Sequence, residues 1–453
     1  MQQHSSLPPV TLFWAIGALL IALANTPLAA AQEAVDSPEA ELPLEQLRAF
    51  ADAFNHIRLS YVEEIDDKTL LENAIRGMLN GLDPHSNYLN KKSFDDLQEM
   101  SSGEFGGLGL EVGMENGFVK VIAPIDGTPA EKAGIQSGDL IIKLDGKAVK
   151  GMSLNKAVNT MRGKQGSDIG VTIVREGLRQ PLDITLTRAI INVVSVRSKM
   201  LEPGFGYIRV AQFQEKSGRE FRDEIDKLQQ NSTAMKGLVL DLRNNPGGIL
   251  QSSVEIVDAV LDNGMVVYTQ GRLENSYYEY NASAGDLSDG APIVVLINGG
   301  SASASEIVAG ALQDHHRAVI MGTESFGKGS VQTVVPLSQD NAIKLTTARY
   351  YTPKGRSIQA QGIVPDITVK RAKIEELPSR SGITEADLQG HLSSEDGTEN
   401  DSAQREAKAS TELFNRDNQL YEALNLLKGL HILSLNSAAD RLVPAPAKLT
   451  KTL

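Results

Sequence analysis

The sequence predicts an α/β multidomain protein, and three patterns along the chain indicate it. Between residues 200 and 370, β-branched runs alternate with amphipathic stretches, as is typical of an α/β layer fold. Residues 100–190 instead hold short β-branched runs separated by glycine, which indicates a small β-rich domain. Residues 41–90 repeat apolar side chains at helical spacing. With 453 residues, the chain is long enough for at least two cores.

Each element of the α/β segment follows from a local pattern. Strands are expected where aliphatic and β-branched residues run together, and helices where apolar residues recur every three or four positions. The expected strands are Phe205–Val210, Gly237–Leu242, Val266–Thr269, Ile293–Ile297 and Ala318–Met321. The expected helices are Lys216–Leu228, Leu250–Val260 and Ser303–Leu312.

The flanking segments are assigned in the same way. The β-rich domain is expected to contain a helix at Leu154–Met161 and strands at Phe118–Ile122, Leu140–Leu144, Val171–Val174 and Leu182–Leu186. Two helices within residues 41–90 make only a small core, so we expect their apolar faces to rest on another domain or on a second copy of the chain. A last amphipathic helix, with Leu413, Leu420, Leu424 and Leu427, is expected to pack or to join an oligomer. A homo-oligomer through these helices is therefore predicted.

The N-terminus and the composition limit the location and the chemistry. Residues 1–31 carry no charged side chain, and the apolar run Val10–Ala24 precedes three alanines, which is typical of a cleaved signal peptide. We expect an exported, periplasmic protein; an uncleaved membrane anchor is the alternative. The net charge of −13 argues against nucleic acid as a partner. With no cysteine and seven scattered histidines, the sequence indicates no metal site and no other cofactor.

A glycine-rich turn, FGGLGL at residues 105–110, opens the β-rich domain. Backbone N–H groups in such a turn can converge on a carboxylate, and the adjoining sheet edge can pair with an extended peptide. The following pattern PAEKAGIQSGDLIIKLDG, residues 129–146, closely resembles the PDZ signature of bacterial proteases. The expected binding residues for the C-terminus of a protein or peptide are Gly107, Leu108, Gly109 and Leu110. A β-rich domain without peptide binding is the alternative.

Three serines follow the expected strand Ile293–Ile297, in NGGSASASE at residues 298–306. A helix is expected to begin there, and its backbone N–H groups and dipole favour negative charge, so a serine nucleophile would lie near oxyanion donors. Ser303-x-x-Glu306 is equally a capping box, in which the serine only caps the helix. The local sequence does not decide between these roles, nor among Ser301, Ser303 and Ser305.

A serine nucleophile also needs a base. His315 and His316 lie about 12 residues further along the same helix, roughly 18 Å away, too far for a hydrogen bond. Lys328, in GTESFGKGSVQ at residues 322–332, is the remaining candidate, provided that burial lowers its pKa. Gln332 can accept a hydrogen bond from the amine. The same segment begins like a phosphate-binding loop, but Gly329 replaces the required Ser or Thr, so nucleotide binding is not expected.

These segments together resemble the carboxyl-terminal processing (tail-specific) serine proteases. The family's hallmark segments match NGGSASASEIVAGALQD, GTESFGKGSVQ, YYTPKGRSIQAQGIVPDI, DLRNNPGG and GLDPHSNYL. Its serine precedes its lysine by 25 positions and its glutamine by 29, the spacing of Ser303, Lys328 and Gln332. The resemblance implies that Ser303 is the nucleophile, that Lys328 is the general base and that Gln332 orients the lysine.

The resemblance also implies an oxyanion hole and a coupling residue. One donor would be the backbone N–H of Ala304 and the other that of Gly248, with Gly247 as the alternative. Without the resemblance, the DLRNNPGG segment would be an ordinary βα turn. Arg162 aligns with an arginine that links the PDZ domain to the active site in this family, although a helix-terminal arginine is usually a surface charge.

The implied architecture is a crotonase/ClpP-like α/β protease core with an inserted PDZ domain. The expected segments are a signal peptide (1–31), an N-terminal helical region (32–99), a PDZ domain (100–190), a protease core (191–375), an acidic linker (376–410) and a C-terminal helix and tail (411–453). The expected function is an exported endopeptidase that captures protein C-termini and cleaves them at a Ser-Lys-Gln site. A non-catalytic PDZ scaffold and a latent protease that needs an adaptor lipoprotein are the alternatives.

Overall fold

The computed structural model describes residues 43–230, 234–372, 389 and 417–441. The expected signal peptide, nearly all of the expected acidic linker and Leu413 lie outside the described residues. The chain divides into a small unit that ends at Leu70 and a larger unit that begins at Leu71. Within the described ranges, no helix has the length and apolar character needed to cross a membrane.

The smaller unit contains α1 (Leu44–Ser60) and the start of α2 (Asp67–Asn80). Both helices are predicted by the apolar spacing of this region. α1 buries none of its residues, and Leu47, Phe50 and Ile57 are all exposed along it. The apolar stripe of α1 is therefore open to solvent in the single chain.

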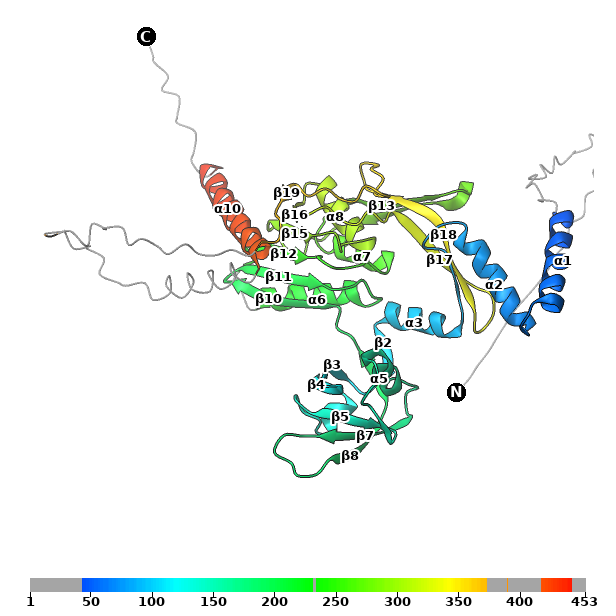
Figure 1. Ribbon diagram of the computed structural model, residues 1–453. Coiled ribbons are helices and arrows are strands. Elements are labelled where there is room, and N and C mark those ends of the chain that lie inside the picture. Colours follow the sequence, from blue (N-terminus) through cyan, green and yellow to red (C-terminus); the bar gives the residue numbers. More distant parts are fainter. Residues whose placement is uncertain (1–42, 231–233, 373–388, 390–416, 442–453) are drawn as a thin grey trace, which may run out of the picture. The chain divides into compact units, whose positions relative to one another are not determined.

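A six-stranded sheet forms the centre of the larger unit, in the order β10-β11-β12-β15-β16-β19 (Figure 1). All neighbours are parallel except β10 and β11. β12 and β15 are buried along their whole length, as expected for continuous apolar runs in a parallel sheet covered on both faces. The strands are β10 (Val196–Glu202), β11 (Phe205–Val210), β12 (Gly237–Asp241), β15 (Ile293–Ile297), β16 (Ala318–Gly322) and β19 (Ile367–Thr368).

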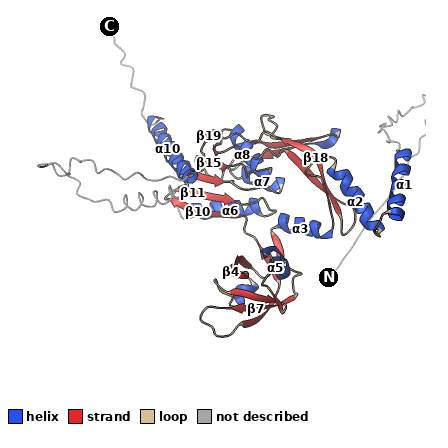
Figure 2. Cartoon of the chain, in the orientation of Figure 1, coloured by secondary structure: helices blue, strands red, loops and turns tan. Residues whose placement is uncertain are grey.

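Helices cover both faces of this sheet, as the helices and strands coloured in Figure 2 show. Leu238 and Leu240 of β12 point toward the first group of helices, and Val239 points toward the last helix, where it meets Leu420 and Leu424. Because side chains alternate along a strand, β12 contributes to both cores. The first group is α6 (Ser217–Gln230), α7 (Leu250–Asp258) and α8 (Ala304–Asp314), and the last helix is α10 (Asn418–Arg441).

A second sheet has the order β1-β18-β13-β14, with β17 paired to β18. The antiparallel hairpin of β17 and β18 places Gln332 opposite Thr346. β1 pairs with the other edge of β18, so the segment just before β1 also lies beside this strand. The elements are β1 (Asn87–Leu89), β13 (Gly264–Gly271), η1 (Glu274–Ser276), β14 (Tyr277–Ala282), β17 (Ser330–Pro336) and β18 (Ala342–Tyr351), and α3 (Lys91–Ser102) follows β1.

The β-rich domain has its own sheet and core. The sheet order is β3-β4-β5-β7-β8, so β3 is an edge strand, and β6 pairs with β5. Its core contains Val119, Ile141 and Ile173, which are completely buried. A separate pair, β2 (Glu104–Gly107) and β9 (Ala189–Asn192), joins the two ends of the domain. The elements are β3 (Leu110–Glu115), β4 (Phe118–Pro124), α4 (Pro129–Lys132), β5 (Leu140–Leu144), β6 (Lys147–Ala148), α5 (Leu154–Met161), β7 (Asp168–Val174) and β8 (Leu182–Thr187).

The α/β multidomain class predicted from the sequence is confirmed. β5, β11, β15 and α5 begin and end at the expected residues. The sequence patterns did not separate α3 from the N-terminal helices, and they did not indicate β10, β14 or β18.

Candidate active site

Ser303 lies at the turn between β15 and α8, directly before the first residue of α8. Its backbone has φ 57° and ψ −115°, an unusual conformation for a residue with a side chain. Such strain persists only where the surroundings hold it, and it is common at catalytic positions. Ser303 is half-buried and lines a cavity of about 450 Å³.

The other two serines of this turn have structural partners. The Ser301 hydroxyl donates to the backbone oxygen of Leu242 at 2.7 Å, and the Ser305 hydroxyl donates to that of Asn245 at 2.9 Å. Both serines are fully buried, and neither lines the cavity. The geometry therefore favours Ser303 as the nucleophile among the three.

Glu306 links the serine turn to the loop that carries Lys328. One carboxylate oxygen accepts from the backbone N–H of Ser303 at 2.7 Å and of Lys328 at 2.9 Å. The other accepts from the Ser325 hydroxyl and from the N–H of Gly327, both at 2.6 Å. Burial raises the pKa of Glu306, while these four donors oppose that rise. The sequence suggested Glu306 only as a helix-capping residue, and the structure adds this second role.

Lys328 lies in the loop between β16 and β17 and lines the same cavity as Ser303. Gly329 allows the loop to pack closely, because a Cβ there would lie 2.5 Å from the backbone nitrogen of Gln359. Among the described residues, the Lys328 amine has no hydrogen-bond or ion-pair partner. Burial lowers its pKa and the nearby cation of Lys344 lowers it further, whereas Glu306 acts in the opposite direction.

Gln332 lies on β17 and lines the cavity with Lys328. Its amide nitrogen donates to the Ser330 hydroxyl at 2.9 Å and to the Thr346 hydroxyl at 3.4 Å. The Thr346 hydroxyl uses its own proton to donate to Asp83 at 3.1 Å, so it can only accept from Gln332. This series of hydrogen bonds fixes which end of the Gln332 amide is nitrogen. The amide oxygen has no hydrogen-bond partner among the described residues. The sequence did not identify Asp83 or Thr346; Asp83 lies in the GLDPHSNYL segment, whereas Thr346 had no signal.

The backbone N–H groups expected to form an oxyanion hole also line the cavity. The N–H of Ala304 at the start of α8 and the N–H of Gly248 have no acceptor in the described part of the chain. The N–H of Gly247, in contrast, donates to the Asn245 side chain at 2.9 Å. Gly248 is therefore the better donor of the two glycines. A Cβ on Gly247 would lie 2.7 Å from Ser303 Cβ, so a glycine is needed for this close approach.

Three segments match family models. Residues 204–369 match the model of peptidase family S41, residues 106–186 a PDZ domain, and residues 18–93 the N-terminal domain of the activating protease CtpB. The chain is 49% identical over 387 residues to the carboxy-terminal-processing protease of Bartonella bacilliformis, which covers 85% of this chain and 88% of that protein. The chain belongs to the carboxy-terminal processing protease family. It is a serine endopeptidase with a PDZ domain, as the sequence predicted.

Other relatives of this protease are more distant. The processing protease CtpA of Bacillus subtilis is 36% identical over 327 residues, which cover 72% of this chain and 69% of that protein. The solved structure of the photosystem II D1 C-terminal processing protease is 33% identical, with a TM-score of 0.43 over 72% of this chain and 92% of that one.

The PDZ domain of the protease has the features of a carboxylate-binding turn. Gly107 ends β2, Leu108 and Gly109 form the turn, and Leu110 begins β3. The N–H groups of Leu108 and Gly109 have no acceptor within the described ranges. Gly109 has φ 79°, and a Cβ there would lie 2.2 Å from the Thr128 side chain, so glycine is required. The free edge of β3 begins directly after this turn.

Arg162 follows α5 of the PDZ domain and contacts two other elements. Its Nη1 donates to Glu99 of α3 at 3.1 Å, and its guanidinium lies 4.5 Å from the ring centre of Phe105 on β2. Its Nε is buried, and no hydrogen-bond partner for it occurs among the described residues. Arg162 does not line the Ser303 cavity. Its hydrogen bond with Glu99 connects the end of α5 to α3.

Proposed function

We propose that the protease cleaves peptide bonds with Ser303 as nucleophile, Lys328 as general base and Gln332 as the residue that orients the lysine. The neutral amine of Lys328 takes the proton of the Ser303 hydroxyl while the serine oxygen attacks the scissile carbonyl carbon. The resulting oxyanion accepts hydrogen bonds from the N–H groups of Gly248 and Ala304. The ammonium then returns the proton to the departing amine, and water releases the acyl group. The lowered pKa of Lys328, in the cavity that Ser303 also lines, carries this proposal.

Substrate capture is assigned to the PDZ domain. The terminal carboxylate of the substrate binds the N–H groups of Leu108 and Gly109, which have no acceptor among the described residues, and the extended chain pairs with the edge strand β3. The wall of the cavity near Ser303 includes the apolar side chains of Met100, Ile249 and Val331. A hydrophobic residue before the scissile bond fits this wall.

The catalytic assignment is tested by the cleavage of a tagged peptide or of casein by the full chain. Ser303→Ala and Lys328→Ala are each expected to lower kcat/KM by roughly 10³-fold or more. Lys328→Arg keeps the charge but never supplies a neutral base, so it should be as inactive as Lys328→Ala. Equal cleavage by wild type, Ser303→Ala and Lys328→Ala would reject the assignment.

We further infer that the protease is exported to the periplasm. The uncharged, apolar residues 1–31 support export. Mass spectrometry of protein from the periplasmic fraction is expected to find Gln32 as the first residue; a chain that keeps Met1 would contradict cleavage.

We also infer that the protease self-associates through its terminal helices. The exposed apolar side chains of α1 support this contact. Sedimentation measures the oligomeric state of wild type and of Phe50→Asp, and a monomer in both proteins would contradict the role of α1.

An adaptor lipoprotein that activates a latent form is the remaining alternative, and turnover by the purified chain alone would argue against it.

A further inference from the structure

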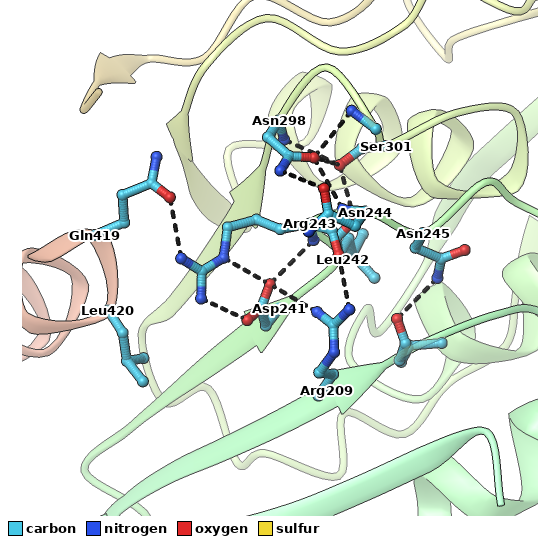
Figure 3. A network of polar contacts seen from close by, with 12 residues as sticks. Arg209, Asp241, Leu242, Arg243, Asn244, Asn245, Asn298, Ser301, Gln419 and Leu420 are labelled. Carbon is cyan, nitrogen blue, oxygen red and sulfur yellow. Dashed lines mark hydrogen bonds and ion pairs between the residues drawn. The ribbon is translucent and has the colours of Figure 1, made fainter. Parts of the chain in front are cut away.

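Arg243, in the loop that follows β12, is held from two sides. From one side, Asp241 accepts from its Nε at 3.0 Å and from its Nη2 at 2.7 Å. From the other side, Asp417, just before α10, accepts from Nη1 at 2.8 Å and from Nη2 at 2.7 Å. Gln419 of α10 also accepts from Nη1 at 3.0 Å. Figure 3 shows the guanidinium of Arg243 between Asp241 and Gln419.

Arginines outnumber aspartates in this cluster, because Arg371 also lies beside Asp417. Arg209 lies 3.3 Å from Asp241 and donates to the backbone oxygen of Arg243 at 2.9 Å. Three arginines thus surround two aspartates in a largely buried site, where an unpaired charge is costly. Burial disfavours the charged form of Asp417, but the hydrogen bonds and charge of Arg243, the N–H of Leu420 and the charge of Arg371 together outweigh this and lower its pKa. Asp417 therefore supplies an anion on which the cluster depends.

The loop held by Arg243 is bonded step by step to the serine turn. Asn244 and Asn298 exchange two hydrogen bonds, at 2.8 and 2.9 Å (Figure 3). The backbone oxygen of Asn245 accepts from the N–H of Ala302 at 3.0 Å. Three residues after Asn245, the chain reaches Gly248, whose N–H is free in the described part of the chain. These hydrogen bonds connect Arg243 to the two segments that carry the proposed oxyanion donors, the loop that leads to Gly248 and the turn that leads to Ala304.

We propose that Asp417 is a positioning residue for catalysis. Through Arg243, it fixes the loop that presents the N–H of Gly248 to the oxyanion. This inference rests on the proposed role of Gly248. An oxyanion donor contributes most when its position is fixed in advance, and a displacement of about 1 Å can cost roughly 100-fold in rate.

A second polar contact of α10 provides a matched control. Lys428 lies on the same helix and contacts Glu202 of β10 at 2.6 Å, away from the Arg243 loop. Lys428→Met removes a contact that docks α10 without touching this loop. Asp417→Asn removes the anion but keeps the shape of the side chain. The two variants therefore separate docking of α10 from positioning of the loop.

The experiment measures kcat, KM and thermal unfolding of the full chain for wild type, Asp417→Asn, Lys428→Met and Ser303→Ala. We expect Asp417→Asn to lower kcat about 10- to 100-fold with KM within about twofold of wild type. Lys428→Met should lower the melting temperature to a similar extent but keep kcat within about twofold. Asp417→Glu, which restores the anion, should recover part of the lost kcat.

Two results would overturn the inference: wild-type kcat in Asp417→Asn, or an equal loss of kcat in Lys428→Met. If Asp417→Asn does not fold, Arg243→Lys replaces it, because it keeps the cation but loses the forked contact. Wild-type kcat in Arg243→Lys would likewise overturn the inference. Active Ser303→Ala would instead reject the proposed function, so the two failures are distinguishable.

Discussion

Glu306 serves the helix and the active site at once. Its carboxylate accepts from the N–H of Ser303, as in a capping box, and also from the N–H groups of Gly327 and Lys328. The proposed nucleophile and the proposed base lie on loops that are separated by α8 and β16, so a shared acceptor fixes their positions relative to each other. Capping and catalysis, which are alternatives for Ser303 in the sequence, are therefore compatible in the structure.

Thr346 is the residue whose replacement best tests the orientation of Gln332. Thr346→Val keeps the volume of the side chain but removes the hydroxyl that accepts from the Gln332 amide and donates to Asp83. We expect kcat to fall roughly 5- to 10-fold with KM unchanged, and stability to fall by about 1 kcal/mol for the lost hydrogen bonds. Steady-state kinetics and thermal unfolding measure the two effects.

Thr347→Val is the matched control for this substitution. Thr347 is the next residue of β18, and its exposed hydroxyl pairs with that of Thr333 at 2.7 Å, away from Gln332. Its replacement should leave kcat at the wild-type level. Equal kinetics of Thr346→Val and Thr347→Val would show that the hydroxyl of Thr346 does not orient the amide.

At the scale of elements, local pattern predicted the strands and helices that are buried by their own composition. β11 and β15 are apolar runs, and α5 has helical spacing, so each begins and ends where expected. β18 was not predicted because AIKLTTARYY contains charged residues and obtains two of its partners, β1 and β13, from distant parts of the chain. Pairing of this kind leaves no local signal.

The same limit applies to the contacts between elements. Leu420, Leu424 and Leu427 predicted the packing face of α10, and they do pack against the central sheet. The partnership of Asp417 with Arg243 joins residues 174 positions apart, and no spacing rule indicates it. The Ser-Lys-Gln spacing was found only through family resemblance, because its residues also lie on separate elements.

At the scale of the whole molecule, capture and cleavage lie in different domains, and Arg162 is the candidate link. Arg162→Ala is expected to lower kcat about 10-fold while peptide affinity, measured in a Ser303→Ala background, stays unchanged. The ion pair with Glu99 is partly exposed and contributes little to stability, so the loss would not reflect unfolding. Fluorescence anisotropy with a labelled peptide and kinetic assays measure the two quantities.

Lys120→Met is the control for this link. It breaks an ion pair with Glu115 that stays within the PDZ domain and has no contact with α3. Turnover should remain at the wild-type level in this variant. Unchanged turnover in Arg162→Ala would discard the coupling role.

The central claim is that Lys328 acts as a neutral amine. The pKa of Lys328 lies below the ordinary value because of burial and of the cation of Lys344, while Glu306 opposes the shift. His85 is a further titratable neighbour, and its pKa is lowered by burial and by the charge of Lys328. A base with a lowered pKa gains activity as pH rises, because the neutral fraction grows about tenfold per pH unit below that pKa. Lys344→Met removes one positive neighbour, so the pKa of Lys328 should rise.

The most direct test is therefore the pH profile of kcat/KM for wild type, Lys344→Met and Lys354→Met. Lys354 is exposed and lies beside His316, outside the cavity, and serves as the charge control. We predict that kcat/KM rises with pH to a plateau and that Lys344→Met moves the midpoint to higher pH, with a several-fold loss at neutral pH, while Lys354→Met matches wild type. A flat profile, or a midpoint in Lys344→Met that is unchanged or lower, would contradict a neutral lysine base.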